Sequence, residues 1–395
     1  MKPHLIALMA VAAVCFPACH KSAPPTAAQT PDGTQTETPS VSADQSKFYM
    51  TAAEDLDGKV KEGTAGLKVL LLDSKYYAVG ERVLSVSFTA DKDIVTDGKT
   101  LTMTWASKDP LVYPVVGHAP AAAEFGLLCL PGSFQGVFTV KTSRYTYQFT
   151  QSVSVSSGAT ASVTLDFAAP DQQPRRKVGV MGDSISTFDG ALCNPDYSPF
   201  YPGSDPNVGV NASIAVDSKE KTYWWRLIHD YMKNGELDVN SSWSGTRVVH
   251  ELKNGRVSGK SMGAGFVDRA YDFQDPDIIL IHGGTNDHNQ NTPLGSYDWD
   301  LPVGQLDAGC YRSAYIQLIK MLQARYEGVQ LILIIGDRLS TNYESSTIEI
   351  ARHFGLPYVN FVGDDIAKCK GSHPNAPAFD QMAAKIYETC KDYLP

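Results

Sequence analysis

Alternation of apolar and polar positions marks the first part of the chain after residue 47. Six short runs there alternate or are continuously apolar, with many β-branched and aromatic residues, which is the pattern of half-buried strands. The runs are 67–72, 83–88, 101–105, 136–140, 145–149 and 161–165. Turn signals such as Asp97-Gly98 and Pro131-Gly132 separate them. We therefore predict a small all-β sandwich over residues 47–169.

The pattern changes after a polar linker with two prolines at 168–174. Five runs of buried-strand type follow, and segments with apolar residues at helical spacing lie between them. The expected strands are 177–181, 236–240, 277–281, 330–335 and 356–361, and the expected helices are 223–233, 311–326 and 375–393. This alternation predicts an α/β domain over residues 176–395, with a five-stranded parallel sheet covered by helices on both faces. All five strands then end at one edge of the sheet, where sites form.

The first 46 residues fit neither pattern. Met1-Lys2 and the apolar residues 5–16 form a signal that is too short to span a membrane as a stable helix. With Cys19 at its end, it resembles a bacterial lipoprotein signal. We predict a lipoprotein signal peptide over residues 1–19, acylated at Cys19, and a flexible tether over residues 20–46, which are rich in Ser, Thr, Pro and Ala. The alternative is a plain secretory signal with an incidental cysteine.

Size, charge and cysteine content limit the number of domains and the kinds of partner that we expect. A chain of 395 residues exceeds the usual size of one core and favours two domains. The net charge of −9 leaves no basic excess for phosphates, so we expect no nucleic-acid partner. None of the cysteines after the signal has metal-ligand spacing, and we expect neither a metal nor a cofactor. Cys369 and Cys390 either form a disulfide or remain free thiols.

Four short motifs fall where chemistry is expected, three at the ends of the first three strands and one before the last helix. They are Gly182-Asp183-Ser184, Asn240 to Gly245, Gly283 to Asp287 and Ser372-His373-Pro374. A serine hydroxyl needs a base to take its proton, and a histidine with its ordinary pKa of about 6.5 suits that task. A glycine amide and an asparagine side chain can donate to a developing oxyanion. Each motif alone fits a turn or helix cap, but the set predicts acyl transfer.

Taken together, these blocks resemble those of the SGNH hydrolases, or GDSL-type esterases, whose four blocks are led by Ser, Gly, Asn and His. The resemblance covers residues 176–395 and implies a flavodoxin-like three-layer α/β/α domain. It also implies Ser184 as nucleophile and His373 as general base. The implied oxyanion hole comprises the Ser184 amide, the Gly245 amide and the Asn286 side chain.

The blocks also carry finer features of the family. The segments Gly182 to Phe188 and Thr222 to Trp225 resemble a branch found among lipoproteins of gut Bacteroidota. We therefore expect a cell-envelope lipoprotein of a Gram-negative bacterium, on the outer membrane or facing the periplasm, held to the membrane through Cys19. One departure is Lys370, which stands where many members have an Asp that orients the histidine.

Two alternatives for the histidine remain open. Either a Ser–His dyad operates, with a backbone carbonyl on the imidazole, or another acid substitutes. The candidate acids near strand ends are Asp337, Asp364 and Asp365. Some carbohydrate esterases that pair a β-sandwich with an SGNH domain also lack the acid.

A long loop, 188–221, follows Ser184, and a loop of this length is typical of a functional segment that could contact the substrate. Its Tyr197, Phe200 and Tyr201 either stack on sugar rings or pin the loop to the domain. Trp243, Arg247 and His288 fall near the expected site and are candidate substrate contacts. No long apolar segment indicates an acyl-chain tunnel, so we expect hydrolysis of short-chain esters, acetyl above all, on a glycan or another small ester. The alternatives are a lipase or thioesterase on the same fold, and a glycan-binding surface lipoprotein without catalysis.

Overall fold

The computed structural model describes residues 50–52, 56, 58–75, 78, 81–95, 98–104, 121–201, 214–251, 256–257, 260–261 and 264–394. All of these belong to one compact unit. The predicted signal peptide with Cys19 and the predicted tether lie outside the described residues, so the lipid anchor stays a prediction. In the described part, no helix has both the length and the apolar character needed to cross a bilayer.

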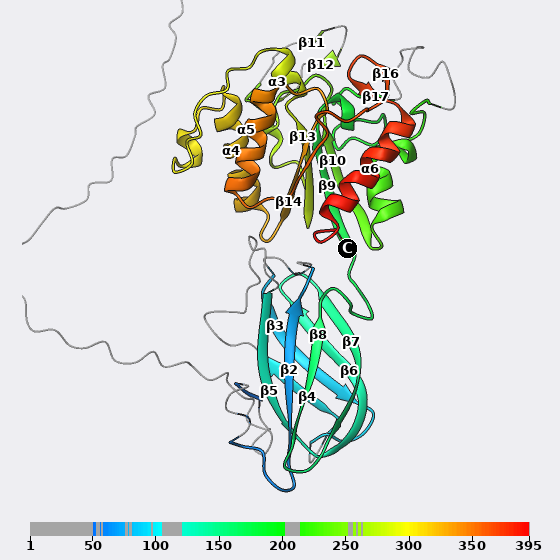
Figure 1. The fold of residues 1–395 in the computed structure, drawn as a ribbon, viewed down its shortest axis with the longest axis vertical. Helices are drawn as coiled ribbons and strands as arrows, with labels where there is room; N and C mark the ends of the chain where they lie inside the picture. The colour runs from blue at the N-terminus through cyan, green and yellow to red at the C-terminus, as the bar shows by residue number, and fades with distance from the viewer. Residues whose placement is uncertain are drawn as a thin grey trace, which may run out of the picture. The chain divides into compact units, whose positions relative to one another are not determined.

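The N-terminal region is all-β, as its alternation predicts (Figure 1). Its strands are β1 (Met50–Ala52), β2 (Ala65–Asp73), β3 (Val83–Ala90), β4 (Thr100–Thr104), β5 (Ala121–Cys129), β6 (Gly132–Thr142), β7 (Thr146–Val155) and β8 (Thr160–Asp166). They form two four-stranded sheets, in the orders β1-β5-β2-β8 and β4-β3-β6-β7. Inward residues of both sheets, such as Val69 and Phe138, share one core. The boundaries 47–169 and 176–395 of the two domains stay a prediction.

Two strands of this region were not expected from the sequence. The more important is β5, which pairs along its whole length with β2. Its sequence starts with three alanines and contains Gly126, residue types that are depleted in strands and that interrupt the alternation. Pairing in the sheet and the burial of Leu127 outweigh that weak local preference.

The C-terminal region contains the predicted parallel sheet. Its strands are β9 (Arg176–Gly182), β10 (Gly235–Ser242), β13 (Ile278–Gly283), β14 (Gln330–Ile335) and β15 (Tyr358–Asn360). Their order in the sheet is β10-β9-β13-β14-β15, and every neighbouring pair is parallel. The chain therefore reverses its direction of winding after β10, which places a switch point beside the carboxyl end of β9. The five-stranded, flavodoxin-like sheet is confirmed.

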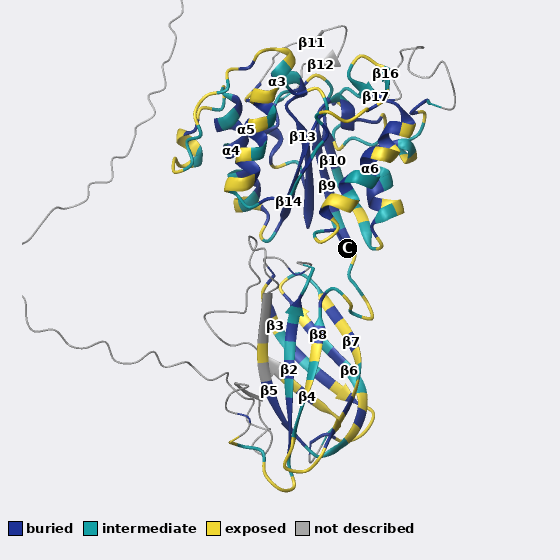
Figure 2. Ribbon diagram, viewed as in Figure 1, coloured by how far each residue is buried: buried dark blue, intermediate teal, exposed yellow. Residues whose placement is uncertain are grey.

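Helices cover both faces of this sheet (Figure 1). One face packs against α4 (Tyr311–Arg325) and α5 (Thr341–His353), and the other packs against α2 (Tyr223–Arg226), the π-helical turn η3 (Leu227–Tyr231) and α6 (Ala376–Cys390). The side chains of β14 alternate between these two cores, with Leu333 in the first and Ile334 in the second. Figure 2 shows that β13 and β14 are buried along their whole length. The three-layer arrangement is thus confirmed.

Helix bounds differ in detail from those expected. The segment 223–233 forms α2 and η3 and ends at Tyr231, and the last helix ends at Cys390 instead of Tyr393. Helix α5 was not expected, because its Thr, Ser, Asn and Tyr residues have modest helix propensity. Burial of Ile350 and Ala351 against the sheet stabilises it nonetheless.

Short elements complete the region and connect the larger ones. They are η1 (Ser184–Ser186), η2 (Lys219–Lys221), β11 (Arg256–Val257), β12 (Lys260–Ser261), η4 (Val267–Arg269), α3 (Thr285–Asn289), η5 (Val303–Gln305), β16 (Lys368–Lys370) and β17 (His373–Pro374). Of these, η1 and α3 directly follow the carboxyl ends of β9 and β13. The candidate residues are therefore carried by short turns at one edge of a rigid sheet.

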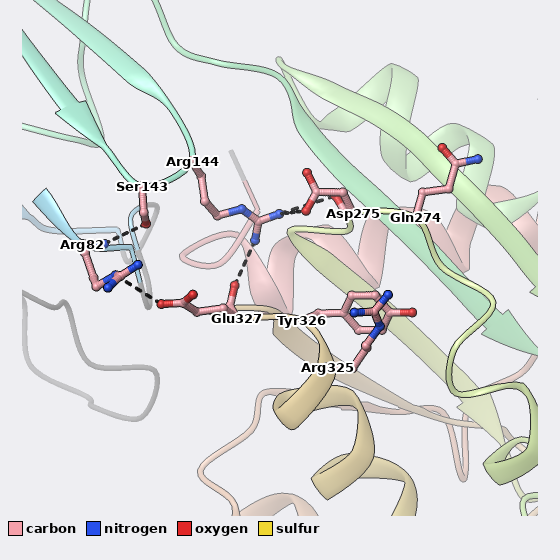
Figure 3. A pocket seen from close by; sticks show the side chains of 8 residues that line it. All are labelled: Arg82, Ser143, Arg144, Gln274, Asp275, Arg325, Tyr326 and Glu327. Carbon is pink, nitrogen blue, oxygen red and sulfur yellow. Dashed lines mark hydrogen bonds and ion pairs between the residues drawn. The ribbon is translucent and has the colours of Figure 1, made fainter. Parts of the chain in front are cut away.

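A cavity of about 300 Å³ lies at the other edge, before the amino ends of β13 and β14 (Figure 3). Arg144 crosses it, donating to a carboxylate oxygen of Asp275 at 2.9 Å and to the Glu327 carbonyl at 3.2 Å. Arg82 pairs with the Glu327 carboxylate at 3.4 Å. Arg144 is thus paired with Asp275, and Arg82 with Glu327. None of the candidate residues lines the cavity.

Candidate functional site

Ser184 is the first residue of η1, immediately beyond the end of β9. The Asp183 side chain caps this turn by accepting a hydrogen bond from the Ile185 amide at 2.9 Å. Gly182 is required for the turn, because a Cβ there would lie 2.4 Å from Ser186 Oγ. The sharp turn at the end of a buried strand leaves the Ser184 side chain half-buried at the sheet edge.

His373 lies in the small β16–β17 hairpin, and its imidazole meets Ser184. Its Nε2 is 2.8 Å from Ser184 Oγ, within hydrogen-bond range. Its Nδ1 is 3.1 Å from the Lys370 carbonyl oxygen. Because a carbonyl can only accept, this contact places the proton on Nδ1 and leaves the Nε2 lone pair facing Ser184. Two residues separated by 189 positions are thus arranged for proton transfer.

The three acids considered from the sequence do not contact this histidine. Asp337 pairs with Lys368 at 2.7 Å, and Asp364 pairs with Lys385 at 2.6 Å. Asp365 is exposed. In the described part of the chain, the contact to Nδ1 comes from the backbone of Lys370, so the arrangement is a dyad held by a carbonyl.

The surroundings of His373 favour its neutral form. Burial of the imidazole is the main cause that lowers its pKa, to about 4. The Lys370 carbonyl raises this pKa, whereas the charges of Lys368 and Lys370 lower it. An imidazole that stays neutral at physiological pH is available as a proton acceptor.

We therefore expect protonation of His373 to cause no fall in kcat/KM for ester hydrolysis down to a pH of about 5. Below a pH of about 4 it should fall about tenfold per pH unit, because protonated His373 cannot accept the Ser184 proton. Initial rates over pH 3.5–8 would measure this limb, and assays at pH 7 after acid incubation would separate it from unfolding. An apparent pKa of 6.5 or above would contradict the burial of the imidazole.

Two backbone amides at the site are candidate donors to an oxyanion. The Ser184 and Gly245 amides donate no hydrogen bond to any residue that the structure describes. Gly245 adopts a φ of +80°, where a side chain would be strained, and it lies within the turn that the Thr246 hydroxyl closes on the Trp243 carbonyl. Amides without a partner among the described residues are the donors that an oxyanion requires.

Asn286, near the start of α3, contacts a neighbour of each of these two residues. Its Nδ2 donates to the Thr246 carbonyl at 2.9 Å and approaches Asp183 Oδ2 at 3.4 Å. The first acceptor follows Gly245 in sequence and the second precedes Ser184, so Asn286 bridges both blocks. The bond to Asp183 is the longer and weaker of the two, so its amide hydrogen is the one for which a ligand oxygen would compete.

Two acidic side chains beneath the site are fully buried. Burial raises the pKa of Asp183 to about 7, although the Ile185 amide opposes this rise. Burial also raises the pKa of Asp287 to about 6, and the Val248 amide, which donates to its carboxylate at 2.8 Å, lowers it. Near neutral pH, the negative charge next to the candidate oxyanion hole is therefore reduced.

A buried arginine missed by the sequence analysis joins the first two blocks. Arg269, at the end of η4, is 1% exposed and donates to the Ser241 carbonyl, to the Gly182 carbonyl at 3.3 Å and to Thr246 Oγ1 at 3.1 Å. It therefore ties the ends of β9 and β10 to the turn that carries Gly245. No motif surrounds it in the sequence, so nothing local indicated this role.

The three candidate substrate contacts lie in different settings. Trp243 is 7% exposed and stacks on Tyr197 with ring centroids 4.3 Å apart, so little of its ring faces solvent. Arg247 forms an ion pair with Glu251 at 2.7 Å. His288 is half-buried against the edge of Tyr343. Contact of Trp243, Arg247 or His288 with substrate stays a prediction.

The aromatic residues of the long loop pin the loop, which is one of the two alternatives considered above. The Tyr197 hydroxyl donates to Asp272 at 2.7 Å. Tyr201 is fully buried and donates to the Pro374 carbonyl at 2.7 Å. Residues 202–213 of the loop lie outside the described part. The five described cysteines are free thiols, so Cys369 and Cys390 do not form a disulfide.

Comparison with known families matches this geometry to a class of hydrolase. The model of the family described as GDSL-like Lipase/Acylhydrolase matches residues 176–390. This range contains all four blocks and every element of the parallel sheet. None of the curated proteins matches the chain.

Solved structures resemble the chain more distantly. A protein described as a GDSL-like lipase from Bacteroides uniformis has 30% identity over 54% of this chain and 94% of its own, with a TM-score of 0.46. Another from Bacteroides ovatus has 26% identity over 55% of this chain and 99% of its own, with a TM-score of 0.47. A family two carbohydrate esterase from Clostridium thermocellum, in complex with cellohexaose, has 15% identity over 85% of this chain and 93% of its own, with a TM-score of 0.34.

Proposed function

Since the chain belongs to the GDSL-like lipase/acylhydrolase family and is an ester hydrolase, we propose that it removes short acyl groups, acetyl above all, from a carbohydrate. Ser184 is the nucleophile and His373 is the general base in this proposal. The observation that carries it is the 2.8 Å contact between Ser184 Oγ and His373 Nε2, on an imidazole whose other nitrogen is anchored at the Lys370 carbonyl.

The reaction proceeds through an acyl-enzyme. Ser184 Oγ forms a bond to the ester carbonyl carbon while its proton passes to His373 Nε2, and the carbonyl π pair moves onto the oxygen. The amides of Ser184 and Gly245 and the Asn286 side chain receive this oxyanion. The tetrahedral intermediate collapses by breaking the bond to the alcohol, which takes the proton from Nε2. Water then attacks the acyl-enzyme in the same way and gives its proton to His373 Nε2. Cleavage of the bond to Ser184 Oγ, which regains the proton, releases the carboxylic acid.

The preference for a small acyl group is supported by the polarity around the site. In the described part, the large apolar side chains that are exposed are Leu84, Tyr271 and Leu301, and none belongs to the four blocks. Trp243, the largest apolar residue of the second block, is already packed on Tyr197. The described blocks thus offer hydrogen-bonding groups, which suit a carbohydrate ester, and no apolar channel for a long chain.

A chain-length series tests this proposal. We expect kcat/KM for p-nitrophenyl acetate to exceed that for the octanoate by about tenfold or more, since each misplaced methylene can cost about that factor. Acetate release from acetylated xylan, pectin and sialic acid, with Ser184→Ala as the control, identifies the carbohydrate. Rates that rise with chain length would instead favour a lipase or thioesterase, and binding to these glycans without acetate release would favour a glycan-binding protein.

A further inference from the structure

Phe200 lies flat against the imidazole of His373. Their ring centroids are 3.4 Å apart and their planes differ by 4°, which is a face-to-face stack. The Phe200 ring is half-buried, and Tyr201 approaches the same imidazole edge-on, with centroids 6.1 Å apart. The loop that follows the nucleophile thus returns to cover one face of the candidate base.

The backbone of Phe200 is fixed to the nucleophile's own turn. Its amide donates to Thr187 Oγ1 at 2.7 Å, and Thr187 Oγ1 in turn donates to the Ser184 carbonyl at 2.9 Å. The neighbouring Tyr201 hydroxyl donates to the Pro374 carbonyl, next to His373. A displacement of either partner of the dyad would therefore disturb the stack, so the ring and the two reacting groups form one assembly.

The charged surroundings of His373 give this stack a chemical consequence. The titratable groups that face the imidazole or act on its charge are the ammonium groups of Lys368 and Lys370, the Cys369 thiol and the Tyr201 phenol. Among the described residues, none of the groups that shift its pKa is a carboxylate. During proton transfer the imidazole becomes a cation, and the neutral Lys370 carbonyl is its hydrogen-bonded partner.

An aromatic face can stabilise such a cation. The face of a phenyl ring carries partial negative charge, and a cation within about 6 Å of the ring centroid is attracted to it. The attraction is absent while the imidazole is neutral and appears only as the proton arrives. An interaction that strengthens in the transition state raises kcat without changing substrate binding.

We propose that Phe200 is a positioning residue for the base: its ring face holds the His373 imidazole in line with Ser184 and stabilises the imidazolium that forms on proton transfer. This inference rests on the proposed function. It assigns to an aromatic ring the part of the work that a carboxylate performs in members with an Asp three residues before the histidine.

Two variants distinguish stabilisation by the face of the Phe200 ring from apolar packing of its side chain. Phe200→Leu keeps an apolar side chain of similar size but removes the face, whereas Phe200→Tyr keeps the face. We expect Phe200→Leu to lower kcat by roughly 3- to 30-fold with KM unchanged, and Phe200→Tyr to retain kcat within about twofold of the unsubstituted enzyme. Phe354→Leu is the matched control, because Phe354 is a half-buried ring that also lies beside a histidine, His353, but belongs to none of the blocks.

Titration of His373 by NMR gives a readout that packing alone would not move. Its imidazole resonance is assigned by its loss in His373→Gln and is followed from pH 7 to 2, with the amide spectrum recording the fold. We expect Phe200→Leu to lower the pKa of His373 by roughly half to one and a half pH units, and Phe200→Tyr to leave it in place.

The two arms distinguish the failure of this inference from the failure of the proposed function. An identical His373 titration in Phe200→Leu and the unsubstituted protein would overturn the inference, and so would a raised KM with unchanged kcat or an equal loss in Phe200→Tyr. If the unsubstituted protein hydrolysed no ester, the proposed function would fall, while the NMR titration would still decide whether the ring stabilises the imidazolium.

Discussion

Ser184→Ala is expected to lower kcat by about 10⁴- to 10⁶-fold, while the free energy of unfolding changes little. The substitution removes the oxygen that attacks the ester and leaves the amides of the oxyanion hole in place. Because Ser184 Oγ is at the half-buried edge of the sheet, its loss creates no core cavity. Hydrolysis of p-nitrophenyl acetate measures kcat, and a fluorophosphonate probe, which reacts with an activated serine, should label the unsubstituted protein but not the variant.

Ser186→Ala is the matched control for this experiment. It removes the same atom two residues further along, but Ser186 Oγ is 2.7 Å from the Tyr223 hydroxyl and has no contact with His373. We expect it to retain most of the kcat and to lose about 1 kcal/mol of stability with the buried hydrogen bond. Equal loss in both variants would mean that the Ser184 effect reports damage to the η1 turn.

A double variant of Ser184 and His373 tests whether the two side chains act together. Residues that act as one unit are not additive, so Ser184→Ala combined with His373→Ala should be about as slow as Ser184→Ala alone. Losses that multiply would show that the two side chains work independently. That result would contradict a dyad connected by the 2.8 Å contact.

The sequence predicted the parallel sheet and the four blocks because both have local signatures. Continuous apolar runs such as 330–335 mark buried parallel strands, and a carboxyl-end motif follows each of the first three. Strand β5 and helix α5 had no such signature. Their residues have modest intrinsic preference, and packing against β2 and β14 decides their conformation.

The group that holds the His373 imidazole could not be predicted from the sequence either, but for a different reason. A backbone carbonyl, here that of Lys370, has no side-chain signature, so the sequence could offer it only as an alternative beside three candidate carboxylates. Arg269 and Phe200 act through contacts that form when distant segments fold together. The same aromatic loop was compatible with sugar stacking and with anchoring, and tertiary contacts alone separate these two possibilities.

The orientation of Trp243 illustrates the same limit. Its position after the second strand suited a site, but position along a strand end does not specify which way a large ring turns. The structure turns it onto Tyr197, where both rings bury apolar surface. Burial of a large ring outweighed any exposed arrangement at that position.

Asn286→Ala should have the second largest effect, a fall in kcat of about 10²- to 10³-fold with KM changed little. The Asn286 amide is the one side-chain donor among the three groups assigned to the oxyanion, and the negative charge that it receives develops only during attack. The variant also loses the 2.9 Å bond to the Thr246 carbonyl, which helps to hold the turn that carries the Gly245 amide. Both losses act on the transition state, and neither removes a contact expected to bind the alcohol part of the substrate.

Asn286→Asp makes the electrostatic origin testable. It preserves the shape of the side chain but replaces the donor by a carboxylate beside Asp183 and the developing oxyanion. We therefore expect kcat to fall at least as far as in Asn286→Ala, and the loss to grow as pH rises and the new carboxylate ionises. Asn342→Ala, at an exposed asparagine of α5, serves as the control that keeps full activity. A raised KM with unchanged kcat in Asn286→Ala would instead place this amide in ground-state binding, and the oxyanion would then depend on the two backbone amides.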